Sequence, residues 1–313
     1  MVGAEGTRVK QFEAEILSNK RVAESWRELD LAWDPSAGRP APGQFLTLRV
    51  SPRLDPLLRR PFAFAGAAQD ASSVSIVYQV RGSATAILAG LAAGTVLDVI
   101  GPLGRGFPPP APVETALLAA GGIGIGPVLF LARALATSSQ VASTPAASLE
   151  QAREPAHDAR GAVLEAPEQA AAGASATRGG ATLALGFRSA DSIPDLEIPA
   201  GAAICTDDGS AGFPGSVADW VSLNAPAGGL RLYACGPAPM LAALARLCSA
   251  RRWASSFSAE QWMACGVGAC MGCALPATGG GFLRACSEGP VFDSPPGGPF
   301  AVDWAAGAAG ERA

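Results

Sequence analysis

The sequence predicts a multidomain β plus α/β protein, with a β-rich N-terminal domain, a parallel α/β domain and a small cysteine-rich module near the C-terminus. Three observations predict this order. Strand-like runs separated by Pro and Gly come first, apolar strands alternate with helices from about residue 114, and four of the seven cysteines gather after residue 264. At 313 residues the chain is long enough for two or three domains with their own cores.

Residues 1–111 are predicted to form an antiparallel barrel or sandwich. Runs with strand character lie at residues 45–50, 74–80 and 96–100, and Pro- and Gly-rich breaks separate them. The proline-rich stretch 108–112 interrupts any regular element, so we expect it to link this domain to the next.

Residues 112–252 have the pattern of a parallel sheet covered by helices. An apolar run at 115–120, a glycine turn at 121–127 and a helix at 128–135 give the strand–turn–helix order that opens a nucleotide-binding α/β unit. The same alternation then continues, with strands expected at 182–187, 202–206 and 230–234 and helices at 216–223 and 238–250.

A low-complexity insertion at 137–180 breaks this alternation. The segment is rich in Ala, Ser, Glu, Gln and Pro and lacks large apolar residues. Burial of such a segment cannot offset the entropy lost on ordering it, so we expect it to be disordered or loosely helical.

Four cysteines mark the module at 253–298, and the tail at 299–313 is expected to be loosely attached. Cys265, Cys270, Cys273 and Cys286 have the spacing C-x4-C-x2-C followed, after twelve intervening residues, by a fourth cysteine, the plant-type pattern of a [2Fe–2S] cluster held by four thiolates. The glycines among the first three allow a loop to wrap closely around a small cluster. Structural zinc fits less well, because only one C-x2-C pair is present.

The other cysteines and the composition exclude several classes of function. Seven cysteines and the lack of an apolar signal segment disfavour a disulfide framework, and Cys205 and Cys248 are expected to be buried apolar residues. The net charge of −4 implies no broad basic face for nucleic acid, and a single histidine, His157, disfavours histidine-based catalysis. The apolar stretch 115–132 contains several glycines, so we expect a buried strand, turn and helix rather than a membrane span, in a soluble, cytoplasmic protein.

Three further motifs are each ambiguous alone. The glycines of 121–127 allow either close approach to a pyrophosphate or only tight packing. Arg59 and Arg60, before Pro61, are suited to binding a diphosphate, or are a solvated pair at the end of a strand. Cys235, in the run Cys-Gly-Pro, lies either where ligands bind in open α/β sheets or in the core of an ordinary turn.

Seven motifs follow one another along the chain: PGQF at 42–45, RRP at 59–61, GPLG at 101–104, GGIGIGP at 121–127, TDDGS at 206–210, CGP at 235–237 and the cysteine runs around 265–270 and 286. Their order resembles the ferredoxin–NADP reductase superfamily, which has a flavin-binding antiparallel β-barrel followed by a nicotinamide-binding parallel α/β domain. With the C-terminal [2Fe–2S] module, the chain resembles the electron-transfer subunits of class B, NAD-dependent dihydroorotate dehydrogenases.

The resemblance implies an electron relay with FAD, a [2Fe–2S] cluster and NAD(H) as cofactors. Electrons would pass between NADH, FAD and the cluster to or from a separate FMN-containing catalytic subunit that converts dihydroorotate to orotate in pyrimidine biosynthesis. A heterotetramer is expected, with no nucleic acid or membrane as partner. The alternatives are a subunit of another NAD(P)H–ferredoxin-type oxidoreductase and a cluster-based redox sensor, which would not oxidise NADH.

The resemblance also implies site residues, although it assigns no catalytic one. Arg60 is expected to bind the FAD pyrophosphate, with Pro61, Phe62 and Ala63 near the isoalloxazine, and Ala63 stands where the family usually has Ser or Thr. Asp207 and Asp208 would repel a 2′-phosphate and so favour NAD, or are simply turn residues. The remaining expected contacts are Val80, Gly82, Ser83 and Thr85 for the flavin, and Gly122, Gly124 and Cys235 for the nicotinamide nucleotide.

Overall fold

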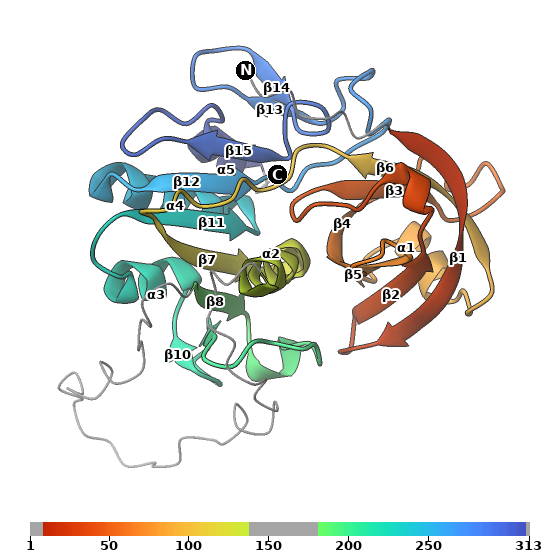
Figure 1. Cartoon of the computed structure of the whole chain (residues 1–313), viewed down its shortest axis with the longest axis horizontal. Coiled ribbons are helices and arrows are strands. Elements are labelled where there is room, and N and C mark those ends of the chain that lie inside the picture. The colour runs from red at the N-terminus through yellow and green to blue at the C-terminus, as the bar shows by residue number, and fades with distance from the viewer. Residues whose placement is uncertain (1–8, 138–180, 311–313) are drawn as a thin grey trace.

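A computed structural model describes residues 9–137 and 181–310 of the chain. A β-barrel is joined to a sheet covered by helices, and the cysteine-rich loops lie along one edge of that sheet and reach the barrel (Figure 1). This arrangement confirms the predicted fold class. Apart from residue 137, the predicted insertion at 137–180 lies outside the described residues.

The N-terminal domain is a closed antiparallel barrel, which decides between the two sequence alternatives. Its six strands follow one another around the barrel in the order β1-β2-β5-β4-β3-β6. The elements are β1 (Lys10–Arg21), β2 (Trp26–Ala32), β3 (Phe45–Arg49), β4 (Arg60–Ala67), β5 (Ser73–Gln79), helix α1 (Ser83–Ala89) and β6 (Val96–Leu103).

Alternating side chains fill the inside of the barrel. Leu46 and Leu48 of β3 are fully buried in the barrel core, whereas Phe45 belongs to the hydrophobic cluster outside it. Trp33 closes the core, with edge-on ring contacts to Phe12 and Phe64 at centroid distances of 4.9 and 5.3 Å. One face of each strand is therefore available to other parts of the chain.

The second domain is a seven-stranded sheet in the order β10-β9-β8-β7-β11-β12-β15, parallel except for the edge strand β15. Its chain order reverses between β7 and β11, and ligands bind open α/β sheets at the carboxyl ends of strands at such a point. The elements are β7 (Thr115–Gly121), α2 (Ile125–Thr137), β8 (Thr182–Phe187), β9 (Ala203–Thr206), β10 (Phe213–Pro214), α3 (Val217–Asn224), β11 (Leu230–Cys235), α4 (Ala238–Arg251), β12 (Ala254–Ser258) and β15 (Val291–Ser294).

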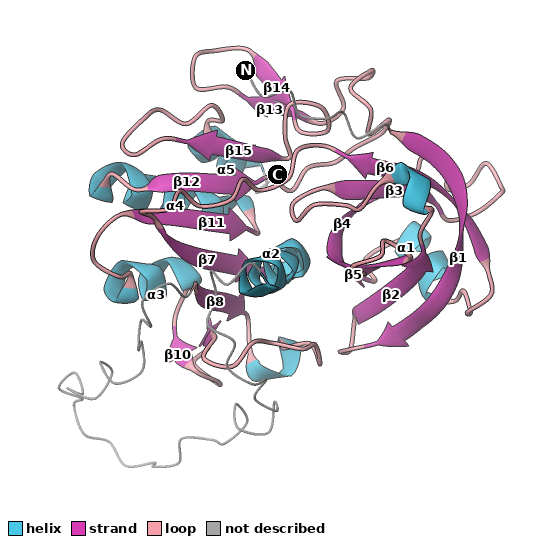
Figure 2. Ribbon diagram, in the orientation of Figure 1, coloured by secondary structure: helices cyan, strands magenta, loops and turns pink. Residues whose placement is uncertain are grey.

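Helices cover both faces of this sheet, which explains the uninterrupted apolar run of β7 (Figure 2). Leu117 and Ala119 face the cluster formed by α3 and α4, while Leu118 and Ala120 pack with α2. Helix α2 lies between the sheet and the barrel (Figure 1). The apolar stretch predicted to be a strand, turn and helix is β7, the glycine turn and α2, and no described helix is long and apolar enough to cross a membrane.

The cysteine-rich segment leaves the sheet after β12 and returns to it at β15. Between them lies the hairpin of β13 (Ala274–Pro276) and β14 (Phe282–Arg284). The tail, which we expected to be loose, is packed instead: Val302 and Trp304 are buried, and the Trp304 ring lies 5.7 Å from that of Phe257, centroid to centroid. It ends in helix α5 (Trp304–Gly310). The exact domain boundaries at 111, 252 and 298 stay predictions.

Backbone contacts join the barrel directly to the end of the cysteine-rich segment. The N–H of Arg105, just after β6, donates to the carbonyl of Gly289 at 2.6 Å. Gly104 has a φ of +72°, and a Cβ there would lie 2.5 Å from Pro290 Cδ and 3.0 Å from the Gly289 carbonyl oxygen. Only glycine fits this close approach without a shift of the backbone.

Replacing Gly104 by alanine should destabilise the protein more than the same change at Gly94. Gly94 has a similar φ of +86° but nothing within 4 Å of its Cβ position, so Gly94→Ala costs only backbone strain of about 1–2 kcal/mol. Gly104→Ala adds the clash with Pro290. Thermal unfolding of the two variants should give the lower Tm for Gly104→Ala, and equal Tm values would contradict the close junction.

Candidate functional site

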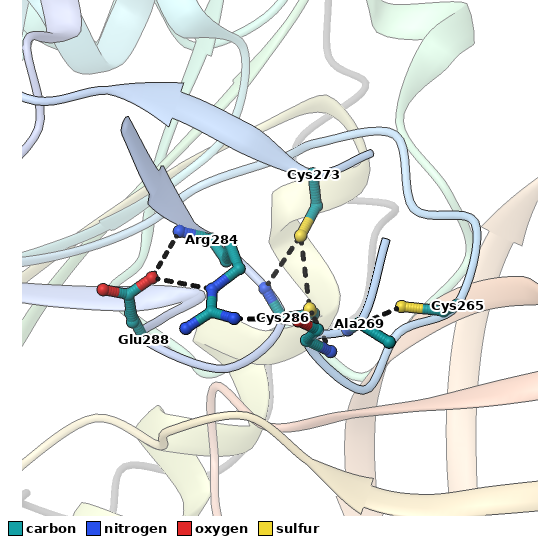
Figure 3. Close-up of polar contacts among 7 residues, drawn as sticks. Cys265, Ala269, Cys273, Arg284, Cys286 and Glu288 are labelled. Carbon is teal, nitrogen blue, oxygen red and sulfur yellow. Dashed lines mark hydrogen bonds and ion pairs between the residues drawn. The ribbon is translucent and has the colours of Figure 1, made fainter. Parts of the chain in front are cut away.

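The four cysteines of the predicted cluster lie in the segment between β12 and β15, where they form two pairs. Cys273 and Cys286 are buried, and their sulfurs face each other 3.2 Å apart (Figure 3). Cys265 is half-buried and Cys270 is exposed at the surface. All are free thiols, as are Cys205 and Cys248, which are buried as expected.

Backbone N–H groups point at these sulfurs. Gly268 donates to Cys286 Sγ at 3.1 Å, and Ala269 donates to Cys265 Sγ at 3.3 Å. Gly272 donates to Cys270 Sγ at 3.4 Å. Such donors stabilise thiolates rather than thiols. Burial raises the pKa of Cys265, but the N–H groups and the Cys270 side chain outweigh it and bring that pKa to about 6.

The loop can direct these N–H groups at the sulfurs because its glycines adopt left-handed backbone and because Arg284 and Glu288 hold it in place. Gly266 and Gly268 have φ values of +70° and +85°, in the left-handed region that glycine adopts without strain. Arg284 donates to the carbonyl of Gly268 at 2.8 Å, and Glu288 accepts both from Arg284 Nε at 3.2 Å and from its backbone N–H (Figure 3). The loop is therefore held from behind by β14.

The thiols fit a two-iron cluster. Within the described ranges, no three His, Cys, Asp or Glu side chains gather as around a single metal ion. The four thiols form two pairs instead, because Cys265 interacts with Cys270 and Cys273 with Cys286. Burial and the neighbouring Cys273 raise the pKa of Cys286, so two bare thiolates at this spacing would repel. Iron bound to them would remove that repulsion.

The two arginines where β4 begins, Arg59 and Arg60, have different partners in the structure. Arg59 forms an ion pair with Asp98, so it does not share a diphosphate as a bare arginine pair would. Arg60 has no carboxylate partner in the described chain, and its guanidinium donates to the carbonyl of Leu58 at 2.6 Å. The uncompensated charge of Arg60 fits the predicted contact with a pyrophosphate.

The other predicted flavin residues lie on β4 and just beyond β5. Pro61 and Ala63 face the same side as Thr47 and Phe45 of β3, their partners in the sheet, while Phe62 packs against the barrel core. The hydroxyl of Thr85 accepts from the N–H groups of Arg81 and Gly82 at 3.0 and 3.1 Å, so it shapes the turn that carries Val80, Gly82 and Ser83. A Cβ on Gly82 would meet nothing within 4 Å, which leaves room for a ligand there.

A cavity of about 830 Å³ lies at the carboxyl ends of β7 and β8, where the topology predicts a ligand. The tip of the β1–β2 hairpin, residues 23–26, forms its wall on the barrel side. Gly122 lines the cavity, with open space at its Cβ position, and its contact with a nicotinamide nucleotide stays a prediction. Gly124 and Cys235 do not line it: a Cβ on Gly124 would lie 2.2 Å from the carbonyl oxygen of Cys235, so this glycine lets the turn pack against β11.

Cys235 therefore lies behind the glycine turn. It is 4% exposed, and burial raises the pKa of its thiol, so it stays protonated and inert at neutral pH. Its predicted contact with the nicotinamide nucleotide stays a prediction. Asp207 lines the cavity, but Asp208 accepts from the hydroxyl and N–H of Ser210 and is a turn residue.

Several residues that line this cavity were not singled out from the sequence, among them Gln79 and Arg188. Gln79, at the end of β5, lines it, and its Oε1 atom is buried without a hydrogen-bond partner in the described chain. That orphaned acceptor fits a ligand with N–H donors. Arg188 directly follows β8 and also lines the cavity. Its place after a predicted strand was a signal that could have found it, whereas nothing local distinguished Gln79.

The fold and sites define a flavin- and iron–sulfur-dependent reductase built on the ferredoxin–NADP reductase plan. Residues 260–295 match a family model described as the iron–sulfur cluster binding domain of dihydroorotate dehydrogenase B. A solved NADH-dependent reduced ferredoxin–NADP oxidoreductase shares the fold, with a TM-score of 0.63 and 22% identity over 97% of this chain and 92% of its own. A cytochrome P450 reductase from Amycolatopsis gives a TM-score of 0.54 at 23% identity over 78% and 68%.

Curated relatives narrow this class to one family. The chain is 34% identical to the dihydroorotate dehydrogenase B (NAD(+)) electron transfer subunit of Geobacillus kaustophilus, over 88% of this chain and 94% of the relative. It is 31% identical to that of Desulforamulus reducens, over 91% and 97%. The chain belongs to this family of electron transfer subunits. The predicted electron-transfer role, the oxidoreductase class and the cofactor set of FAD, [2Fe–2S] and NAD(H) are confirmed, while the FMN-containing partner and the individual site residues remain predictions.

Cys273→Ser should abolish most of the iron binding, whereas Cys248→Ser should not. Cys273 and Cys248 are 2% and 1% exposed, so both variants place a serine hydroxyl at an equally buried position. Only Cys273 faces another cysteine of the quartet. Iron per chain and the broad visible absorbance of protein purified without air should fall steeply for Cys273→Ser alone. Wild-type iron content in that variant would exclude Cys273 as a ligand.

Proposed function

We propose that this chain passes electrons between NAD(H) and an FMN-containing catalytic subunit that converts dihydroorotate to orotate, in a cytoplasmic heterotetramer. The observation that carries the proposal is the placement of the nucleotide cavity, the flavin strand and the cysteine loop around a single barrel. When bound, FAD supplies the conversion between two-electron and one-electron transfer, and the cluster supplies the one-electron relay.

The nucleotide side of this path is built from the sheet and the barrel together. Backbone at Gly122 is open to a ligand, and the carboxylate of Asp207 disfavours an added 2′-phosphate in the same cavity. These features support NAD as the nucleotide. The polar wall that includes Gln79 comes from the barrel, so a bound nicotinamide nucleotide would contact both domains.

The flavin side is fixed to the nucleotide side through α2. Arg133 of α2 donates to the carbonyl of Ala65 in β4 at 3.2 Å. A Cβ on Gly126 would lie 3.3 Å from the Ala65 Cβ, so helix and strand are in close contact. Because Ala63 and Ala65 lie on the same face of β4, this packing holds the proposed isoalloxazine face beside the glycine turn.

We propose that electrons pass to the partner through one surface of the cysteine-rich segment. This surface, called the cluster face, consists of Trp262, Val267, Cys270, Met271 and Phe282. The four apolar side chains are 88%, 50%, 50% and 67% exposed, and the ligand cysteine Cys270 is itself exposed. Exposed apolar side chains in the segment that carries a redox group favour a docking surface for a protein partner. The partner that fits is the catalytic subunit, since the relatives are named electron transfer subunits.

Trp262→Ala should weaken assembly with the catalytic subunit. Truncating a central aromatic residue of an interface costs about 2 kcal/mol or more, which is roughly a 30-fold rise in Kd. Purified holoprotein should be titrated into the catalytic subunit from the same genome, with NAD reduction by dihydroorotate as the readout. Leu223→Ala, a change at a 73% exposed leucine on α3, serves as the matched control and should assemble like the wild type.

The function and the position of the docking surface are tested by different results. No dihydroorotate-dependent NAD reduction by the wild-type pair would contradict the function itself. Normal assembly of Trp262→Ala would leave the function standing and place the docking surface elsewhere.

A further inference from the structure

Thr47 of β3 lies between the proposed flavin strand and the cysteine loop. In the sheet it is paired with Pro61 of β4 on one side and with Ile100 of β6 on the other. Its methyl carbon Cγ2 is the nearest atom to the Cβ position of Gly266, at 2.8 Å. Gly266 directly follows Cys265, a predicted cluster ligand, so Thr47 is the barrel residue nearest to this position at the start of the loop.

The hydroxyl of Thr47 has no hydrogen-bond partner among the described residues. The residue is 1% exposed, and its Oγ1 atom is buried. A buried hydroxyl without a partner destabilises the folded protein, and such groups are rare in native proteins. The orphaned atom therefore points to a bound group that the polypeptide does not supply.

The surroundings limit what that group can be. The side chains next to Thr47 in the sheet are those of Pro61 and Ile100, and the other neighbours of the Gly266 Cβ position are Leu103 and Phe45, at 3.6 and 3.8 Å. All four are apolar and offer no acceptor. Within the described chain the adjoining polar feature is the cysteine loop, whose sulfurs already attract the N–H groups of Gly268 and Ala269. The flavin expected beside Pro61 is the other polar group on this side of the sheet, and the test below separates the two.

We propose that Thr47 is a positioning residue whose hydroxyl donates a hydrogen bond to a sulfur of the [2Fe–2S] cluster, while its methyl group holds Gly266 in place. The inference rests on the proposed cluster at this loop. Hydrogen bonds to cluster sulfurs stabilise the added negative charge of the reduced form and so raise the reduction potential. Thr47 thus belongs to the barrel that holds the flavin and tunes the cluster that exchanges electrons with it.

The test measures the two reduction potentials of the holoprotein alone, the cluster by electron paramagnetic resonance and the flavin by visible absorbance. Thr47→Val keeps the branched shape and removes the hydroxyl, and it should shift the cluster to a lower potential while the flavin potential stays unchanged. Thr47→Ser keeps the hydroxyl and removes the methyl group, and it should retain the wild-type cluster potential. If Thr47→Val loads too little iron, Thr47→Ala replaces it as the variant without a hydroxyl.

Two results would overturn the proposal. An unchanged cluster potential in Thr47→Val would show that the hydroxyl does not act on the cluster. A shift of the flavin potential alone would assign the hydroxyl to the flavin instead. Neither readout involves the catalytic subunit or dihydroorotate, so failure here is distinguishable from failure of the proposed function.

Discussion

The close approach of the cysteine loop to the barrel is the constraint on which the rest of the electron path depends. Two glycines with left-handed backbone make it possible. Gly104 leaves space for Pro290, and Gly266 leaves space for the methyl group of Thr47. The Arg105–Gly289 hydrogen bond closes the junction. Any side chain at these glycines would push the ligand cysteines away from the barrel strands that carry the proposed flavin residues, and electron transfer falls steeply with such separation.

A second junction of the same kind holds the nucleotide site. Gly124 packs its bare Cα against the backbone of Cys235, and Gly126 lets α2 approach Ala65 of β4. The barrel is thus held by the cysteine loop on one side and by α2 on the other. The glycines of this turn have two different uses. Gly122 lines the cavity and leaves space for a ligand, whereas Gly124 lies away from the cavity and lets the turn pack against β11.

Features with a local sequence signal could be predicted, and features set by distant contacts could not. The cysteine spacing, the glycine turn and the strands β7, β8, β9 and β11 each carry a pattern within a few residues. The ion pair of Arg59 with Asp98, the burial of Trp304 and the orphaned hydroxyl of Thr47 depend on residues far away in the chain. The strands β12 and β15 were missed because neither has a clear alternation of apolar and polar residues, and their pairing with each other is visible only in the fold.

The central claim is that one chain connects a nicotinamide nucleotide to an iron–sulfur cluster through a flavin. The most direct test is rapid mixing of oxidised holoprotein with NADH in the absence of air and of any partner, while flavin and cluster absorbance are followed together. Both should bleach, with the cluster following the flavin within the same chain and at a rate independent of protein concentration. A flavin that bleaches while the cluster stays oxidised, or cluster reduction that depends on collisions between molecules, would contradict it.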